Sequence, residues 1–208
     1  MYMENKKINN NEHSYVDLGL PSKTLWATYN VGAKKPEEPG LYFQWGDAKG
    51  YTSKQVGMDK QFNWNNYKWS IDGSNSNFSK YTRKSETLEL EDDAAHVNMG
   101  GSWHIPTLEQ ISELINETVS EWVTLDDAKG MKFTSKKDKS KYIFIPAAGS
   151  ALDGLVVGSG YYAYVWSSML YSGYHLYLVP TLGFDFISPF LCDIYSRDNG
   201  FTVRGVIG

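Results

Sequence analysis

The densest cluster of side chains able to do chemistry is the acidic run Glu89-Leu90-Glu91-Asp92-Asp93. Calcium binds hard oxygen ligands, and this run could supply two or three of them. The spacing differs from an EF-hand loop, which needs alternate oxygens, a glycine and a distal glutamate. Carboxylates also complement the dipole at a helix start, so we favour a solvated acidic face. Calcium binding near Glu91–Asp93 stays open, as does carbohydrate-active chemistry using Glu89, Glu91, Asp92 and Asp93.

Nucleophilic and metal chemistry have little support elsewhere in the chain. The single cysteine, Cys192, excludes an internal disulfide and a thiolate zinc site. It lies among apolar neighbours with no cation to activate the thiol, and the chain has no Gly-x-Ser-x-Gly motif. The four histidines never occur at paired metal-ligand spacing. We therefore expect no catalytic residue, no metal site and no cofactor.

Aromatic residues dominate the C-terminal third. The chain of 208 residues holds 15 Tyr, 9 Phe and 7 Trp, and twelve of these aromatics fall within residues 161–201. Only six charged residues follow position 146, and the last lysine is Lys141. Such a segment is either mostly core or an adhesive surface, and exposed aromatics suit contact with sugar rings or proteins.

We predict a ligand-binding surface in the most apolar part of that segment, between residues 171 and 195. The predicted contact residues are Tyr171, Tyr174, His175, Tyr177, Phe184, Phe186, Ile187, Phe190, Leu191, Asp193, Ile194 and Tyr195.

The elements that must position these residues are mostly short strands. We expect order to begin at residues 15–20, and apolar runs predict strands at 24–28, 41–46, 130–134 and 142–145. Thr107 and Gln110 form a capping-box pattern before an apolar face at helical spacing, which predicts a helix from 108. A weaker helix signal covers 92–97. Residues 47–90 are interpreted as a long surface excursion anchored by Phe62, Trp64, Tyr67 and Trp69.

Length and charge favour one domain over residues 14–208, after a disordered lead-in at 1–13. A net charge of −4, with no basic cluster, gives no reason to expect nucleic acid or an anionic membrane as partner. No apolar stretch is long enough to cross a bilayer, so we expect no membrane insertion. The polar N-terminus carries no signal-peptide pattern.

Eight short strings occur in order along the chain. They are Gly19-Leu20-Pro21-Ser22-Lys23-Thr24-Leu25-Trp26-Ala27-Thr28, Asn30-Val31-Gly32-Ala33, Gly40-Leu41-Tyr42-Phe43-Gln44-Trp45-Gly46, Glu91-Asp92-Asp93-Ala94-Ala95-His96-Val97-Asn98, Gly100-Gly101-Ser102-Trp103-His104-Ile105-Pro106-Thr107, Pro146-Ala147-Ala148-Gly149, Trp166-Ser167-Ser168 and Gly200-Phe201-Thr202-Val203-Arg204. Together they resemble the Fibrobacter succinogenes major paralogous domain, over residues 15–206. The departures are Tyr29, where cysteine is common, and His104, where arginine is usual.

The resemblance implies an α+β, C-type-lectin-like fold related to the formylglycine-generating-enzyme group, with short antiparallel strands, one or two helices and long loops. The enzymes of that group need a reactive cysteine pair, whereas this chain has only Cys192. The Glu-Pro-Asn and Gln-Pro-Asp triplets of calcium-dependent lectins are also missing. What the resemblance leaves is a scaffold that displays a binding surface, with Trp26, Trp45, Trp103 and Trp166 in the core.

The segment 161–197 is also similar to the variable region of proteins diversified by retroelements in phages of Bacteroides-type gut bacteria. We therefore expect a non-enzymatic recognition protein on a phage virion or bacterial cell surface, whose partner is a protein or glycan. The alternative is a structural subunit that uses the same patch as a homo-oligomer interface.

Overall fold

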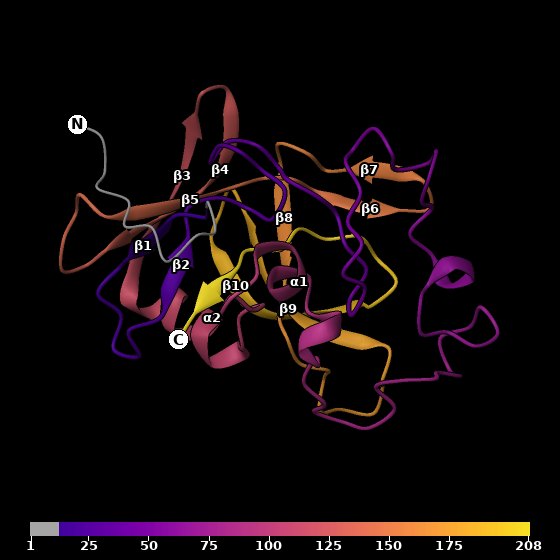
Figure 1. The fold of residues 1–208 in the computed structure, drawn as a ribbon. Coiled ribbons are helices and arrows are strands. Elements are labelled where there is room, and N and C mark those ends of the chain that lie inside the picture. The colour runs from indigo at the N-terminus through magenta and orange to yellow at the C-terminus, as the bar shows by residue number, and fades with distance from the viewer. Residues whose placement is uncertain (1–12) are drawn as a thin grey trace.

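Antiparallel strands make up most of the regular structure, and two α-helices cover part of them (Figure 1). The structure is a computed structural model that describes residues 13–208, apart from the side chains of 191–193. The predicted α+β class is confirmed at this level. Of the predicted lead-in, residues 1–12 lie outside the described part of the chain.

Within residues 13–208, three three-stranded sheets and one hairpin form the frame, in the orders β1-β2-β11, β10-β9-β8, β3-β4-β5 and β6-β7. The strands are β1 (Tyr15–Asp17), β2 (Leu25–Ala27), β3 (Thr118–Leu125), β4 (Ala128–Ser135), β5 (Tyr142–Pro146), β6 (Ser150–Leu152), β7 (Leu155–Val157), β8 (Tyr162–Trp166), β9 (Leu178–Asp185), β10 (Pro189–Ser196) and β11 (Val206–Ile207). The first and last strands both pair with β2, which brings the two ends of the described chain into one sheet.

Both predicted helices are present, and their caps explain where they begin. Helix α2 (Leu108–Glu117) starts after Thr107, whose hydroxyl accepts from the backbone N–H of Gln110 while the Gln110 side chain accepts from that of Thr107. Helix α1 (Ala94–Met99) starts after Asp93, whose carboxylate accepts from two backbone N–H groups of its first turn. Short 3-10 helices lie at Trp64–Asn66 and Leu90–Asp92.

Three of the four predicted strands are confirmed, as β2, β4 and β5, but the strand predicted at 41–46 is wrong. That run makes only isolated bridges, from Tyr42 to Tyr51 and from Phe43 to Phe201. Its neighbouring residues are hydrogen-bonded to different segments of the chain, so no ladder with one partner strand forms. Gly46 then takes a positive φ of 75°, which ends the extended backbone.

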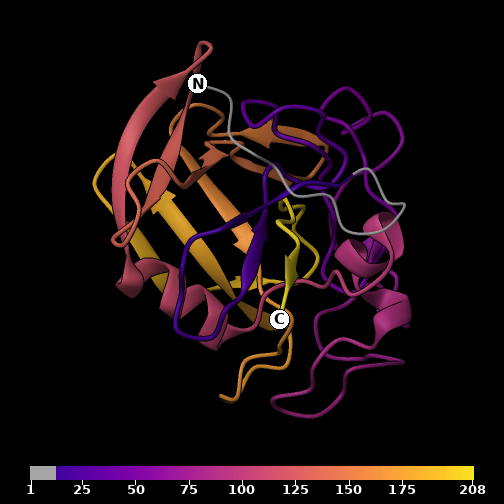
Figure 2. The ribbon, with the colours of Figure 1, turned by 60° about the vertical axis from the view of Figure 1, so that its left-hand side comes forward.

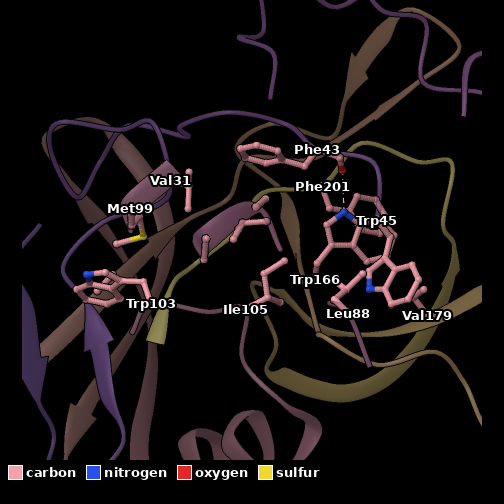
Figure 3. Packing of buried hydrophobic residues seen from close by; sticks show 14 of the residues in the cluster. Val31, Phe43, Trp45, Leu88, Met99, Trp103, Ile105, Trp166, Val179 and Phe201 are labelled. Carbon is pink, nitrogen blue, oxygen red and sulfur yellow. Dashed lines mark hydrogen bonds between the residues drawn. The ribbon is translucent and has the colours of Figure 1, made fainter. Parts of the chain in front are cut away.

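The predicted core tryptophans are confirmed: Trp26, Trp45, Trp103 and Trp166 are each at most 4% exposed. Figure 3 shows Trp45 and Trp166 close to Phe201 in the main core cluster. The indole N–H of Trp166 donates to the carbonyl of Phe43 at 2.7 Å, and that of Trp45 donates to the carbonyl of Ser167 at 2.9 Å. These bonds fix irregular segments that have no ladder of their own.

The excursion at 47–90 is anchored as predicted. Phe62 and Tyr67 are buried, and Trp64 and Trp69 are half-buried. The Tyr67 hydroxyl donates to the carbonyl of Trp45, and the Trp69 indole donates to that of Gly46. A long segment without strands therefore has a defined position beside the sheets.

Arg204 holds three separate segments together from inside the core. The residue is fully buried, and it donates to the side-chain oxygen of Asn30 and to the carbonyls of Ala27 and Phe144 at 2.7–2.9 Å. Burial lowers the pKa of Arg204 to about 9. No carboxylate is among these acceptors, so the neutral oxygens alone satisfy the guanidinium.

Replacing Arg204 by Met should therefore destabilise the fold by about 3 kcal/mol or more, since three buried oxygens lose their donors. Urea unfolding measures the change. Arg83→Met, at an exposed arginine, is the matched control and should shift the free energy of unfolding by less than about 0.5 kcal/mol. An Arg204→Met loss as small as that of the control would show that these hydrogen bonds do not hold the segments.

Candidate functional site

The predicted contact residues do not form one surface. Tyr171, Tyr174, His175 and Tyr177 precede β9, whereas Phe186 and Ile187 follow it, in the turn to β10. Eight strand residues lie between the groups, and at about 3.3 Å per residue they hold the groups more than roughly 20 Å apart. Figure 2 shows these two ends of β9 on different sides of the molecule. The expectation of a continuous patch over 171–195 is therefore wrong.

Phe184 is the clearest correction among the predicted contacts. Its side chain is fully buried, and its ring packs 6.5 Å from the rings of Trp122 and Phe133. Strand β9 is covered on both faces, so its apolar residues belong to the core. A strand buried on both faces reads as a continuous apolar run, which the sequence cannot distinguish from an adhesive surface.

Strand β10 carries half-buried residues instead of free contacts. The ring of Phe190 lies over Gly183, where an added Cβ would come within 2.0 Å of it. The Tyr195 hydroxyl donates to the Tyr164 hydroxyl at 2.5 Å. Ile194 is also half-buried. The predicted contacts at Leu191 and Asp193 concern side chains outside the described part of the structure.

The segment before β9 meets the long excursion and forms with it what we call the loop surface. This surface consists of the exposed Tyr174, His175 and Lys84 and the half-buried Tyr171, Tyr177, Trp64 and Phe78. Tyr174 is 93% exposed, and the ammonium group of Lys84 lies 4.7 Å from its ring centroid. In Figure 1 the segment 171–177 runs beside the excursion at the lower edge of the molecule. The backbone N–H of Leu170 also donates to the carbonyl of Glu86.

Aromatic contacts continue across the loop surface. The ring of Tyr177 lies 5.2 Å from that of His175 and 6.3 Å from that of Trp64, which in turn lies 5.7 Å from Phe78. Sequence reasoning treated Trp64 as an anchor only and did not consider Phe78. Trp64 and Phe78 contact residues more than a hundred positions further along the chain, and no local sequence pattern predicts such contacts.

Arg197 lies directly beneath the loop surface and is fully buried. Its backbone N–H donates to the carbonyl of Tyr177, and its side-chain Nη1 donates to that of Tyr81. The guanidinium carbon lies 3.4 Å from the ring centroid of Phe78. Burial lowers the pKa of Arg197 from its ordinary value. One residue thus connects the segment before β9 to the excursion.

The acidic run at 89–93 is organised by lysine. The ammonium group of Lys80 lies 2.6–3.2 Å from carboxylate oxygens of Asp92, Glu89 and Glu91, and Lys68 lies 2.8 Å from Asp92. These three carboxylates are the one group of possible metal ligands in the described residues, and an ammonium group already pairs with all of them. The run is therefore an ion-pair cluster and not simply a solvated face.

Asp93 has a different role from its neighbours. It caps α1 and also accepts from the backbone N–H of Ile105, so both of its oxygens are engaged in local structure. Burial raises the pKa of Asp93. This arrangement gives no support to a general acid–base pair in the run.

No helix within residues 13–208 is long and apolar enough to cross a membrane. Comparisons with protein-family models, curated proteins and solved structures found no match to this chain.

Two phenylalanines near the end of β9, Phe184 and Phe186, test the assignment of the predicted contact residues to the core or to the surface. Phe184→Ala should cost roughly 3–5 kcal/mol of unfolding free energy, since it leaves a cavity in the core. Phe186→Ala, at a side chain 66% exposed, should cost less than about 0.5 kcal/mol. Urea unfolding of both variants measures this, and equal losses would contradict the assignment of Phe184 to the core.

The ion pairs of Asp92 predict an acid-sensitive contribution to stability. Burial opposes ionisation of Asp92, but hydrogen bonds from Lys68, Lys80 and Tyr81 outweigh it and lower the pKa of the carboxyl below 3.8. The contribution is fully present above about pH 5 and is lost as the pH falls through the lowered pKa. The free energy of unfolding of Asp92→Asn should therefore fall less steeply than that of the wild type between about pH 5 and 2. Identical slopes would exclude this role.

Proposed function

We propose that this chain is a non-enzymatic recognition protein that binds a protein or glycan on a cell surface through the loop surface. The observation that supports this proposal is a pair of exposed ring side chains on a backbone segment that is held in place by hydrogen bonds. Tyr174 and His175 are exposed. Two residues after His175, the carbonyl of Tyr177 accepts a hydrogen bond from the backbone N–H of buried Arg197. Tyrosine gives a large contact area at low entropic cost, which suits such a site.

The backbone around the loop surface supports a preorganised site. Tyr171 donates its backbone N–H to the carbonyl of Leu178, and Leu178 donates to that of His175, so the segment folds back on itself. On the other side, the backbone N–H of Leu88 donates to the carbonyl of Ser168. Binding would order few additional groups, and the association would lose little further entropy.

We also propose a C-type-lectin-like fold of the Fibrobacter succinogenes major paralogous domain type. The short antiparallel strands, two described helices and long excursion are compatible with that proposal. The resembling strings contain the buried Trp26, Trp45, Trp103, Trp166 and Arg204. These strings thus encode the frame, while the loop surface lies almost entirely outside them.

The proposal includes diversification of this protein by a retroelement, on a phage virion or bacterial cell surface. The pattern of exposed and buried residues indicates which positions would vary. Within 161–197, buried residues such as Val179 and Leu182 form a continuous run in β9, whereas the exposed Tyr174 and Phe186 lie before and after that strand. Exposed positions tolerate substitution at a cost of about 0.5 kcal/mol or less, whereas core positions do not. Variation should therefore be concentrated at the exposed positions and not across the whole segment.

Sequencing the gene codon by codon across its native population tests this. We expect substitutions to be most frequent at the exposed Tyr174 and His175, with the buried Phe184, Trp166 and Arg197 unchanged. Equal substitution rates at exposed and buried positions of the segment, or a complete lack of variation, would contradict diversification.

An assembly role for the other end of β9 is the second candidate. Phe186 and Ile187 are 66% and 75% exposed in the turn before β10, and apolar side chains at a turn are suited to contact between subunits. Light scattering decides between the roles: an oligomer that dissociates in the double variant Phe186→Ser, Ile187→Ser supports assembly, and a monomer at all concentrations excludes it.

A further inference from the structure

A groove beside Tyr161 is a candidate for a second binding site, separate from the loop surface. Its volume is about 420 Å³, within the roughly 300–1,000 Å³ of small-molecule sites. Four segments form it: residues 37–39, the β3–β4 turn with the start of β4, residues 146–148 at and just after the end of β5, and residues 159–161 before β8. Tyr161 lies at the end of the β8-β9-β10 sheet opposite to Tyr174, because Tyr162 pairs with Asp185.

The walls of the groove are held by backbone geometry. Asp126 and Asp127 both have positive φ values, of 43° and 68°, as in the tight turns that join twisted strands, and this fixes Asp127 at the rim. Gly160 donates its backbone N–H to the carbonyl of Ala147 at 2.7 Å, and Ala147 donates to that of Lys129 at 2.8 Å. The rim residues therefore have defined positions without a ligand.

Polar groups around the groove are available for binding. Within residues 13–208, neither the carboxylate of Asp127 nor the ammonium group of Lys129 has a hydrogen-bond or ion-pair partner, and the hydroxyl of Ser159 has none. Among the described residues, the carboxylate of Glu37 pairs only with the ammonium group of Lys35, at 3.6 Å. Its side chain is 15% exposed, so this carboxylate lies partly inside the groove wall. The site thus offers two acceptor carboxylates and two donors.

Apolar surface accompanies these polar groups. Tyr161 is 70% exposed and presents an aromatic ring at the rim, and prolines and alanines line the remainder of the groove. An aromatic ring packs well on the C–H face of a sugar, and the donors and acceptors around it match the hydroxyls at a sugar's edge.

The charges select among ligand classes. Glu37, Asp127 and Lys129 give the lining a net charge of about −1 at neutral pH, which disfavours an anionic ligand. Lys129 disfavours a compact cation, which would use only the acceptors. A neutral ligand with both donor and acceptor hydroxyls uses every group present. We propose that the groove binds one unit of a neutral saccharide, with Tyr161 packed on the ring and Glu37, Asp127, Lys129 and Ser159 bound to its hydroxyls.

The test uses the whole chain and defined sugars. The methyl glycosides of galactose, mannose, glucose and N-acetylglucosamine are titrated in turn, in EDTA, while backbone amide shifts are followed by NMR. We expect at least one sugar to give saturable shifts confined to residues 37–39, 127–129, 146–148 and 159–161. Saturation in EDTA separates this site from calcium-dependent binding. No saturable shift with any of the four, or shifts elsewhere, would overturn the proposal.

Three variants test the residues of the groove. Tyr161→Ala and Asp127→Asn should each weaken binding of the responding sugar by about tenfold or more, since each removes one of few contacts in an open site. Ile71→Ala, at a side chain 61% exposed that belongs neither to the groove nor to the loop surface, is the control and should leave the affinity unchanged. Both groove residues are exposed, so the variants should fold, as their amide spectra will show. Wild-type affinity in folded Tyr161→Ala and Asp127→Asn would refute the assignment. So would tighter binding of the cation methylammonium than of every sugar.

Discussion

A buried cation without a carboxylate partner is the constraint on which the frame depends. Desolvating a guanidinium group is expensive, so Arg204 must find oxygen acceptors within the core. It finds them at Ala27 at the end of β2, at Asn30 just after that strand and at Phe144 in β5, and these acceptors can satisfy it only in one mutual arrangement. The same principle operates at Trp166 and Trp45, whose indole N–H groups bond to carbonyls of irregular segments. Buried donors thus determine the positions of loops that have no strand ladder.

Only part of the frame was predictable from sequence, and that part has local signals. Thr107 and Gln110 lie three residues apart and define the start of α2 by themselves, and the alternation around Trp26 is sufficient to predict β2. The prediction at 41–46 failed because its partners, Tyr51 and Phe201, lie at very different distances along the chain. An extended run becomes a strand only when one neighbour supplies consecutive hydrogen bonds, and no local pattern reports that.

The candidate site was harder to predict because exposure is a property of the whole fold. Phe184 and Phe186 are two residues apart and chemically identical, yet one is buried against Phe133 and the other faces solvent beyond the end of β9. Likewise, the acidic run could be identified from sequence, but its dominant partner, Lys80, could not. The ammonium group reaches Asp92 across a bend of the excursion, so what looked like a site for an external cation is paired internally.

The pairing of both chain ends with β2 has a mechanical consequence. Strands β1 and β11 are each antiparallel to β2, so they run parallel to one another on its two sides. The residue that enters β1, Tyr15, is opposite Ala27, and the residue that leaves β11, Ile207, is opposite Leu25. A pull that separates the two ends therefore acts along the strands and loads their hydrogen bonds together in shear, instead of peeling them apart one at a time. A module tethered at these ends would keep its fold under tension.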